Sequence, residues 1–201
     1  PFTSDASSSL YPTRRRSLVL PIRDAMARRQ ECRNVTLPIL VSVPHAGLQV
    51  PVEVRELCHL SVEEIVADGD EGASEIYSIE DRVGQYTTTD IARAIVDLNR
   101  AADDFRSDGV IKTHTCWNVP VYTRYPSQDV IHQLLTKYYW PYHHLLQCER
   151  KGVRLSVDCH TMAEFGPPIG PGAGQRRPHV CLGDGGHALP NGWMETLVDC
   201  F

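Results

Sequence analysis

Leu37-Pro-Ile-Leu-Val-Ser-Val43, followed directly by Pro44-His45-Ala46-Gly47, is the stretch that decides the fold. A short apolar run that stops at a Pro and a Gly is typical of a buried strand, because it has the length of a strand and a turn signal at its end. The strand would deliver His45 into the loop that follows it. In α/β proteins, functional side chains gather in such loops.

Two further apolar runs end in polar residues in the same way. Residues 92–98 lead to Asn99-Arg100, and residues 153–157 lead to Asp158-Cys159-His160. We predict that both runs are strands. If the three strands are neighbours in one sheet, the polar residues at their ends converge at one edge of that sheet.

Helical patterns lie between these runs. Apolar residues recur near helical spacing over residues 73–83 and 129–150, and Pro141 predicts a kink or boundary in the second helix. Ser61-Val-Glu-Glu64 has the spacing of a capping box, which opens a helical turn. Strands that alternate with helices predict an α/β fold in which a largely parallel or mixed sheet is covered on both faces.

Composition limits the function. The chain has 201 residues, a net charge of -5 and 42% hydrophobic residues, which suits one domain with a sizeable core. No apolar run reaches the roughly 18 residues that cross a bilayer, so we expect no membrane partner. The slight acidity argues against a nucleic-acid partner. We therefore expect a small-molecule substrate, and the candidate carboxylate clamp Arg100, discussed below, favours an anionic one.

The seven cysteines include no Cys-x-x-Cys pair, so we expect neither a zinc ribbon nor a redox motif. Reduced, mostly buried thiols are the expected state, and they favour the cytoplasm. Cys159, beside His160, is a weaker candidate for a nucleophile, because a residue inside a short buried strand usually packs.

Residues 1–34 are rich in Ser and then in Arg, with few acidic residues. This composition is typical of an organelle transit peptide or of a disordered extension. Because the chain starts at Pro1 rather than Met, we expect a processed or partial product. We divide the chain into this extension and a catalytic domain over residues 35–201, and an organelle is the alternative location if the extension is a transit segment.

His45 and His160 are the best candidates for metal ligands. Imidazole nitrogens, one carboxylate and an open position for water make up the ligand set of catalytic zinc sites. The acidic loop after residue 67 supplies the carboxylate, with Asp70 as the first choice and Glu71 as the second. Asp158 lies on the same side of its strand as His160 and could orient that imidazole. Manganese, iron or cobalt would also suit these ligands.

These residues also have structural interpretations. A single His after a strand is commonly hydrogen-bonded within the fold, and an Asp in a loop commonly forms a turn or a cap. Arg100 could pair with an aspartate at the surface, or it could clamp a substrate carboxylate with two hydrogen bonds. His143 and His144 diverge by about 100° on a predicted helix, so we expect them to be structural.

Seven short segments of the chain are specific when they are taken together in their order and spacing. They are Pro44-His-Ala-Gly47, Asp68-Gly-Asp70 with Ile76-Tyr77, Ile95-Val-Asp-Leu-Asn-Arg100, Val119-Pro-Val-Tyr122, Tyr139-Trp-Pro-Tyr-His143, Asp158-Cys-His-Thr161 and Leu182-Gly-Asp184. In this order they resemble the segments of N-formylglutamate amidohydrolases, also called deformylases. The resemblance covers the chain from about Leu37 to its C-terminus, and the family is similar in turn to zinc carboxypeptidases.

The resemblance implies a phosphorylase/hydrolase-like fold, a three-layer α/β/α sandwich around a mixed, mostly parallel sheet. It implies zinc-dependent hydrolysis of N-formyl-L-glutamate to formate and L-glutamate, in histidine degradation. Through the similarity to carboxypeptidases it gives Asn99 and Arg100 the role of binding a substrate carboxylate. Arg124 is a second candidate for such a clamp, because the substrate has two carboxylates.

The chain departs from the family at the general base. Family members continue beyond the Gly-Asp segment into strands that supply a glutamate, whereas this chain ends at Phe201. Glu164 is the candidate to replace that base, and we group Asp158 with it as a catalytic residue. The alternatives are a zinc carboxypeptidase-like or N-acyl amino acid hydrolase, a catalytically degenerate binder of an anionic metabolite, and a cysteine hydrolase that uses Cys159.

Overall fold

The computed structural model describes residues 36–148, 152–186 and 188–201. The predicted N-terminal extension, residues 1–34, lies outside them. Residues Leu37–Phe201 form one compact unit. Within the described part of the chain, none of the helices combines the length and the apolar character that a bilayer span requires.

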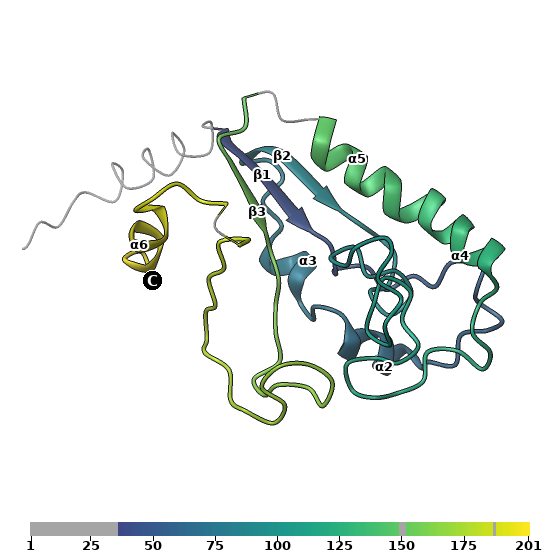
Figure 1. Cartoon of the computed structure of the whole chain (residues 1–201). Helices are drawn as coiled ribbons and strands as arrows, with labels where there is room; N and C mark the ends of the chain where they lie inside the picture. Colours follow the sequence, from purple (N-terminus) through teal and green to yellow (C-terminus); the bar gives the residue numbers. More distant parts are fainter. Residues whose placement is uncertain (1–35, 149–151, 187) are drawn as a thin grey trace, which may run out of the picture. The chain divides into compact units, whose positions relative to one another are not determined.

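Three parallel strands form the sheet, in the order β2-β1-β3 (Figure 1). They are β1 (Leu37–Val43), β2 (Val83–Thr88) and β3 (Leu155–Asp158). The register pairs Val43 with Thr88 and Ser42 with Asp158, so the three carboxyl ends lie at the same edge. The predicted α/β class is confirmed, and so are the strands expected around residues 37–43 and 153–157.

The loop after β1 packs directly on the backbone of a distant segment. Gln49 donates its backbone N–H to the carbonyl of Asp90 at 2.8 Å. A Cβ atom on Gly47 would lie 2.3 Å from the carbonyl carbon of Asp90, which is far inside contact distance. A glycine is therefore required at this position, and the close approach fixes the path of the chain just after His45.

The prediction of a strand over residues 92–98 is wrong. The third strand of the sheet is β2. Residues 92–98 form turns, in which Val96 donates its N–H to the carbonyl of Ala92 at 3.2 Å. The run is apolar because it is buried, and burial alone does not distinguish a strand from a turn. In β2 the buried positions include Gln85 and Thr87, so the strand lacks a continuous apolar signal.

The helices of the described chain are α2 (Val62–Asp68), α3 (Ala73–Ile76), α4 (Gln128–Leu134), the π-helix η1 (Leu135–Tyr139), α5 (Trp140–Cys148) and α6 (Trp193–Val198). The predicted capping box is confirmed: Ser61 and Glu64 exchange hydrogen bonds between side chain and backbone at the start of α2. The helix predicted over residues 73–83 is shorter than expected. It ends at Ile76, and Val83 already belongs to β2.

The long helix predicted over residues 129–150 is confirmed over its described part, as α4, η1 and α5 in succession. The π-helical turn lies directly before Pro141, where Trp140 donates its N–H to the carbonyl of Leu135. Proline has no N–H, so the carbonyl of Lys137 loses its regular partner four residues on. The widened turn is the local response to the boundary that Pro141 predicts.

Two clusters of buried apolar residues make up the core. In the larger cluster, residues 91–98 pack with residues 110–111 and 121–122 and with the helix that includes Leu134 and Tyr142. The smaller cluster joins β1, β2 and α3. The larger cluster buries the segment around Asp97, and this segment supplies part of the site described next.

Candidate metal centre

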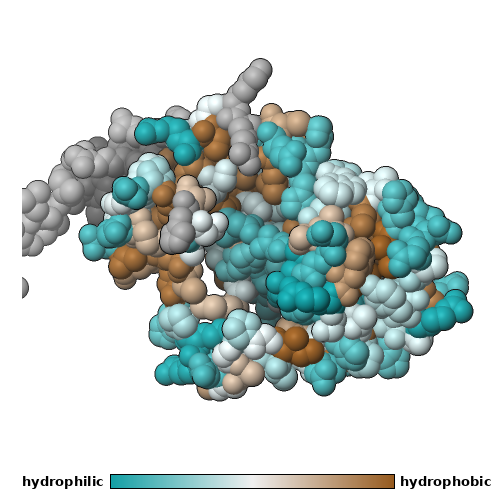
Figure 2. All heavy atoms as spheres, in the orientation of Figure 1, coloured by the Kyte–Doolittle hydropathy of each residue, from teal (hydrophilic) through white to brown (hydrophobic). Residues whose placement is uncertain are grey.

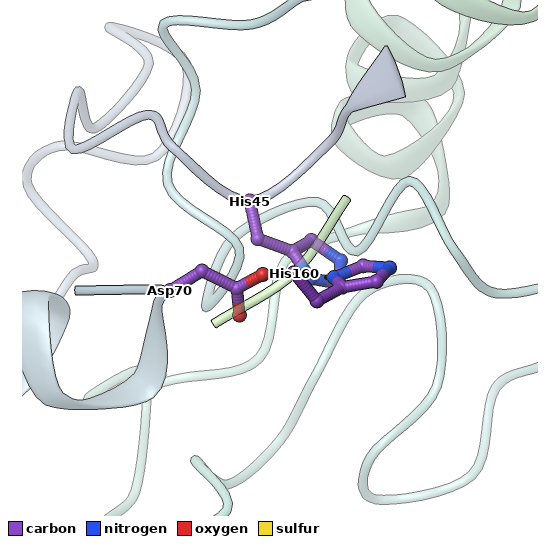
Figure 3. A group of neighbouring side chains, drawn as sticks. All are labelled: His45, Asp70 and His160. Atoms are coloured by element: carbon purple, nitrogen blue, oxygen red, sulfur yellow. Dashed lines mark hydrogen bonds and ion pairs between the residues drawn. The ribbon is translucent and has the colours of Figure 1, made fainter. Parts of the chain in front are cut away.

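Three side chains from three different connections meet beyond the end of β1 (Figure 3). His45 follows β1, Asp70 follows α2 and His160 follows β3. One ligand atom from each lies within 4.8 Å of the other two. The structure thus brings together the three residues that the sequence predicted as metal ligands. Glu71, the second choice, is exposed, and its backbone carbonyl accepts a hydrogen bond from Thr161.

A buried carboxylate that the sequence analysis missed holds the ring of His45. Nε2 of His45 lies 2.9 Å from Oδ1 of Asp97. Because a carboxylate accepts, Nε2 is the protonated nitrogen and Nδ1 keeps its lone pair. Nδ1 is buried, has no hydrogen-bond partner among the described residues, and lies 3.6 Å from Oδ2 of Asp70. A buried lone pair beside a carboxylate fits a metal ligand.

Asp97 is itself held by three cations. Its Oδ2 lies 3.1 Å from Nε of Arg93, 3.5 Å from Nζ of Lys112 and 3.8 Å from Nε of Arg100. Burial alone would raise the pKa of Asp97, but the hydrogen bond to His45 and the charges of Lys112 and Arg93 lower it far below its ordinary value. Asp97 is therefore an anion, as its role as acceptor requires.

His160 lies between two carboxylates. Its Nδ1 is 2.8 Å from Oδ2 of Asp70, and its Nε2 is 3.1 Å from Oδ2 of Asp158. The side-chain amide of Asn99 donates to Oδ2 of Asp158 at 2.8 Å. This arrangement supports the predicted orienting role of Asp158. Asp158 is not among the described residues that line the cavity discussed below, so its position gives no support to a catalytic role.

A chain of hydrogen bonds connects Asp158 to helix α5. Oγ of Ser42 donates to Oδ1 of Asp158 at 2.6 Å, and the same Oγ lies 2.7 Å from the hydroxyl oxygen of Tyr142. A serine hydroxyl has one hydrogen, so Tyr142 is the donor to Ser42. Ser42 and Tyr142 are buried. The core of the molecule therefore fixes the carboxylate that orients His160.

The charges of the site suit a cation. Burial alone would raise the pKa of Asp70, but the hydrogen bond to His160 and the nearby His45 hold it at about 2. Burial alone would lower the pKa of His160, but its bonds to Asp158 and Asp70 raise it to about 9. The pocket thus attracts positive charge between its carboxylates. Two imidazoles and one carboxylate fit zinc or another divalent transition metal.

A cavity of about 550 Å³ opens beside these residues. Hydrophilic side chains gather in the middle of the face shown in Figure 2. Asn99 and Arg100, the two predicted substrate-binding residues, line the cavity together with the candidate ligands. Nη2 of Arg100 lies 3.3 Å from Oδ2 of Asp108, while its Nε is buried without a hydrogen-bond partner among the described residues. The Arg100 side chain is 33% exposed, so outer N–H groups of its guanidinium are available to a substrate carboxylate in the cavity.

Two predicted site residues lie elsewhere. Arg124 is exposed and is not among the described residues that line the cavity. Glu164 is exposed too; it forms a 3.0 Å ion pair with Arg176 and does not belong to that lining either. The structure does not bring these two residues to the metal ligands.

The remaining candidates have structural environments. Burial and the nearby Asp158 raise the pKa of the Cys159 thiol, which disfavours the thiolate that a nucleophile needs. His143 lies 3.0 Å from the carbonyl of Leu98, as expected for a structural residue. His144 lies near the sulfur of Cys148 on the same helix. None of these contacts involves the three candidate ligands.

Comparisons with known proteins support the fold and show the family of the chain. The chain is similar to the crystal structure of N-formylglutamate amidohydrolase from Ralstonia eutropha JMP134, with a TM-score of 0.56 and 19% sequence identity. The similarity covers 65% of this chain and 55% of that chain, so the match spans about half the length of the solved protein. A comparison with curated protein sequences gave no significant match. The family model described as N-formylglutamate amidohydrolase matches residues 37–201, and the chain therefore belongs to this family.

Proposed function

We propose that the chain hydrolyses the formyl amide of N-formyl-L-glutamate to formate and L-glutamate with the help of a zinc ion. The observation that carries this proposal is the buried, unpartnered Nδ1 of His45, which faces Asp70 beside His160. Membership of the N-formylglutamate amidohydrolase family supports the substrate. The free thiols of the described cysteines are compatible with the cytoplasm, which we retain as the proposed compartment.

A zinc ion held by His45, Asp70 and His160 would polarise the formyl carbonyl and lower the pKa of a water molecule toward neutrality. The chain prepares both imidazoles for this ion. Asp97 fixes the hydrogen of His45 on Nε2, and Asp158 accepts from Nε2 of His160, so that Nδ1 of each ring is turned toward Asp70.

Arg100 and Asn99 would hold the substrate beside the metal ligands. The partly exposed guanidinium of Arg100 suits a carboxylate, and binding there would orient the amide toward the histidines. Arg100 is already positioned by Asp108 and Asp97, so little side-chain freedom is lost when the substrate binds.

One observation favours a second candidate function, the binding of an anionic metabolite without turnover. The carboxylates that line the cavity are Asp68, Asp70, Asp97 and Asp108, and each has a Lys, Arg or His partner. The described lining thus offers no unpaired carboxylate to act as general base. Under this alternative the chain binds formylglutamate and releases no formate.

The experiment that tests the proposal compares two histidine variants of the full chain. His160→Ala should lose both bound zinc and formate release. His144→Ala is the matched control, because His144 is exposed on α5, and it should keep both. Zinc is measured by elemental analysis and formate by a coupled assay. Zinc at full stoichiometry in His160→Ala would overturn the assignment of the ligands.

A substrate panel separates the proposal from a carboxypeptidase-like or N-acyl amino acid hydrolase. We expect formate to be released from N-formyl-L-glutamate faster than acetate or longer acids from the corresponding N-acyl glutamates. A preference for longer acyl groups, or cleavage of peptides, would favour the alternative hydrolase instead.

A further inference from the structure

One basic residue that lines the cavity differs from the others because it has no ion-pair partner among the described residues. Of the described residues, five basic side chains line the cavity: Arg93, Arg100, Arg106, Lys112 and Arg177. The first four form ion pairs with Asp97, Asp108, Asp104 and Asp68, respectively. Arg177 has no carboxylate within ion-pairing distance in the described part of the chain. Its charge is available to an anion in the cavity.

A hairpin directly after His160 sets the position of Arg177. Arg177 donates its backbone N–H to the carbonyl of Glu164 at 2.8 Å, and Gly166 donates to the carbonyl of Gln175 at 2.9 Å. The hairpin is also tied to the body of the domain, since Ile169 donates to the carbonyl of Cys116 at 3.0 Å. Arg177 thus lies at the base of the hairpin. Its backbone pairs with Glu164, which follows His160 closely in the chain.

The two neighbouring arginines of the hairpin have different surroundings. Arg176 points outward, where its Nε forms the 3.0 Å ion pair with Glu164 and both side chains are more than half exposed. Arg177 is only partly exposed and lines the cavity. The backbone pairs Arg176 with Phe165, so the ion pair between Arg176 and Glu164 runs diagonally across the hairpin. Glu164 therefore neutralises Arg176 and leaves Arg177 unpaired.

We propose that Arg177 binds the side-chain carboxylate of a dicarboxylic N-acyl amino acid and makes the site selective for glutamate over neutral amino acids. The inference rests on the proposed function and adds a residue to it: Arg100 and Asn99 anchor one carboxylate, and Arg177 anchors the other. A guanidinium suits this task because it offers two parallel donors to a carboxylate. Arg177 takes the role expected of Arg124, which does not line the cavity.

Kinetics of two neighbouring variants test the inference. Arg177→Gln should lower kcat/KM for N-formyl-L-glutamate about 10- to 100-fold, mainly through KM, because charge-assisted hydrogen bonds are lost. Its kcat/KM for N-formyl-L-glutamine should stay within about twofold of the unmodified chain, because that substrate has no side-chain carboxylate. Arg176→Gln is the matched control and should leave both values unchanged. Equal losses on both substrates in Arg177→Gln, or no loss, would overturn the inference.

A binding measurement separates the inference from the proposed function. Calorimetry with glutarate, which has two carboxylates, and butyrate, which has one, needs no turnover. Arg177→Gln should weaken glutarate binding about tenfold and leave butyrate binding unchanged. If the unmodified chain releases no formate while glutarate shows this dependence, the proposed hydrolysis fails and the role of Arg177 stands. Glutarate binding that is equally strong in Arg177→Gln would disprove that role whatever the formate assay gives.

Discussion

The candidate metal ligands and the hairpin of residues 164–177 differ in how the chain holds them. His45 is 3% exposed and Asp70 is 6% exposed, and Asp97 behind them is fully buried. On the hairpin, Arg176 and Glu164 form their ion pair in solvent, and the turn between them contains three glycines at positive φ, Gly170, Gly172 and Gly174. Two of the candidate ligands are thus anchored in the core and His160 is more exposed, whereas Arg176 and Glu164 lie on an exposed hairpin.

This difference separates two tasks. Metal ligands need fixed positions, because their affinity depends on geometry and on the partners that orient them. Residues that choose a substrate can lie on a surface hairpin, where a substitution changes recognition at little cost to the core. We therefore expect damage near Asp97 to abolish metal binding and folding stability together, and damage in the hairpin to change selectivity alone.

The largest effect is expected for Asp97→Ala. The substitution leaves Lys112 and Arg93 without their shared carboxylate, and breaking a buried ion pair costs about 3–5 kcal/mol. Denaturant titration should show this loss in the free energy of unfolding, and zinc affinity should fall with it. Asp108→Ala removes a more exposed ion pair with Arg100 and should cost less than about 1 kcal/mol. Equal losses of unfolding free energy in the two variants would contradict the stabilising role given to Asp97.

A smaller loss is expected for Gly47→Ala, in the loop that carries His45. The new Cβ meets the Asp90 backbone, so the loop must shift, and overpacking of this kind costs about 1–3 kcal/mol. We expect zinc affinity to fall at least about tenfold, because the loop orients a ligand. Competition with a chromophoric chelator measures it. In the control Gly183→Ala, the added Cβ meets no atom within 4 Å and should change neither quantity.

The hairpin counterpart is Gly166→Ala. Its Cβ would lie 2.1 Å from the carbonyl oxygen of Gly172, which forces the hairpin open and moves Arg177. We expect the preference for N-formyl-L-glutamate over N-formyl-L-glutamine to fall about tenfold while zinc affinity stays unchanged. The readouts are the two kcat/KM values and the chelator titration. Loss of zinc binding in Gly166→Ala would contradict the expectation that the hairpin affects selectivity alone.

The smallest effect is expected for Glu164→Gln. The sequence makes Glu164 the candidate general base, but its exposed pairing with Arg176 predicts that kcat changes less than about twofold. A fall in kcat of about a hundredfold or more, with KM unchanged, would restore its role as the base. The pH profile of kcat distinguishes the two outcomes, since loss of a base removes the acidic limb.

Sequence patterns predicted that His45, Asp70 and His160 lie together, because the two histidines follow predicted strands whose ends are marked by polar residues. The patterns failed where a role depends on contacts distant in sequence. Asp97 belongs to a predicted strand that is a buried turn, and nothing local indicates that it bonds to His45 across 52 residues. The strand β2 was missed because polar side chains occupy its buried positions.

The hairpin shows the same limit on a shorter scale. Arg176 and Arg177 are adjacent and chemically identical; the backbone pairs Glu164 with Arg177, whereas its carboxylate pairs with Arg176. No sequence pattern indicates which of the two arginines lines the cavity. Arg124 and Glu164 have the right chemistry for the site, but their places in the fold do not bring them to its lining.

The hydrogen-bond chain from Tyr142 through Ser42 to Asp158 has a direction. Each hydroxyl donates toward the carboxylate, and with Asn99 donating as well, Asp158 is held as an acceptor. Its Oδ2 accepts from Asn99 and lies 3.1 Å from Nε2 of His160, so this carboxylate orients the imidazole that also contacts Asp70. The polarity of these hydrogen bonds thus connects the position of a helix to the orientation of a candidate ligand. Tyr142→Phe would release the Ser42 hydroxyl from its donor and weaken that connection without touching any group in the cavity.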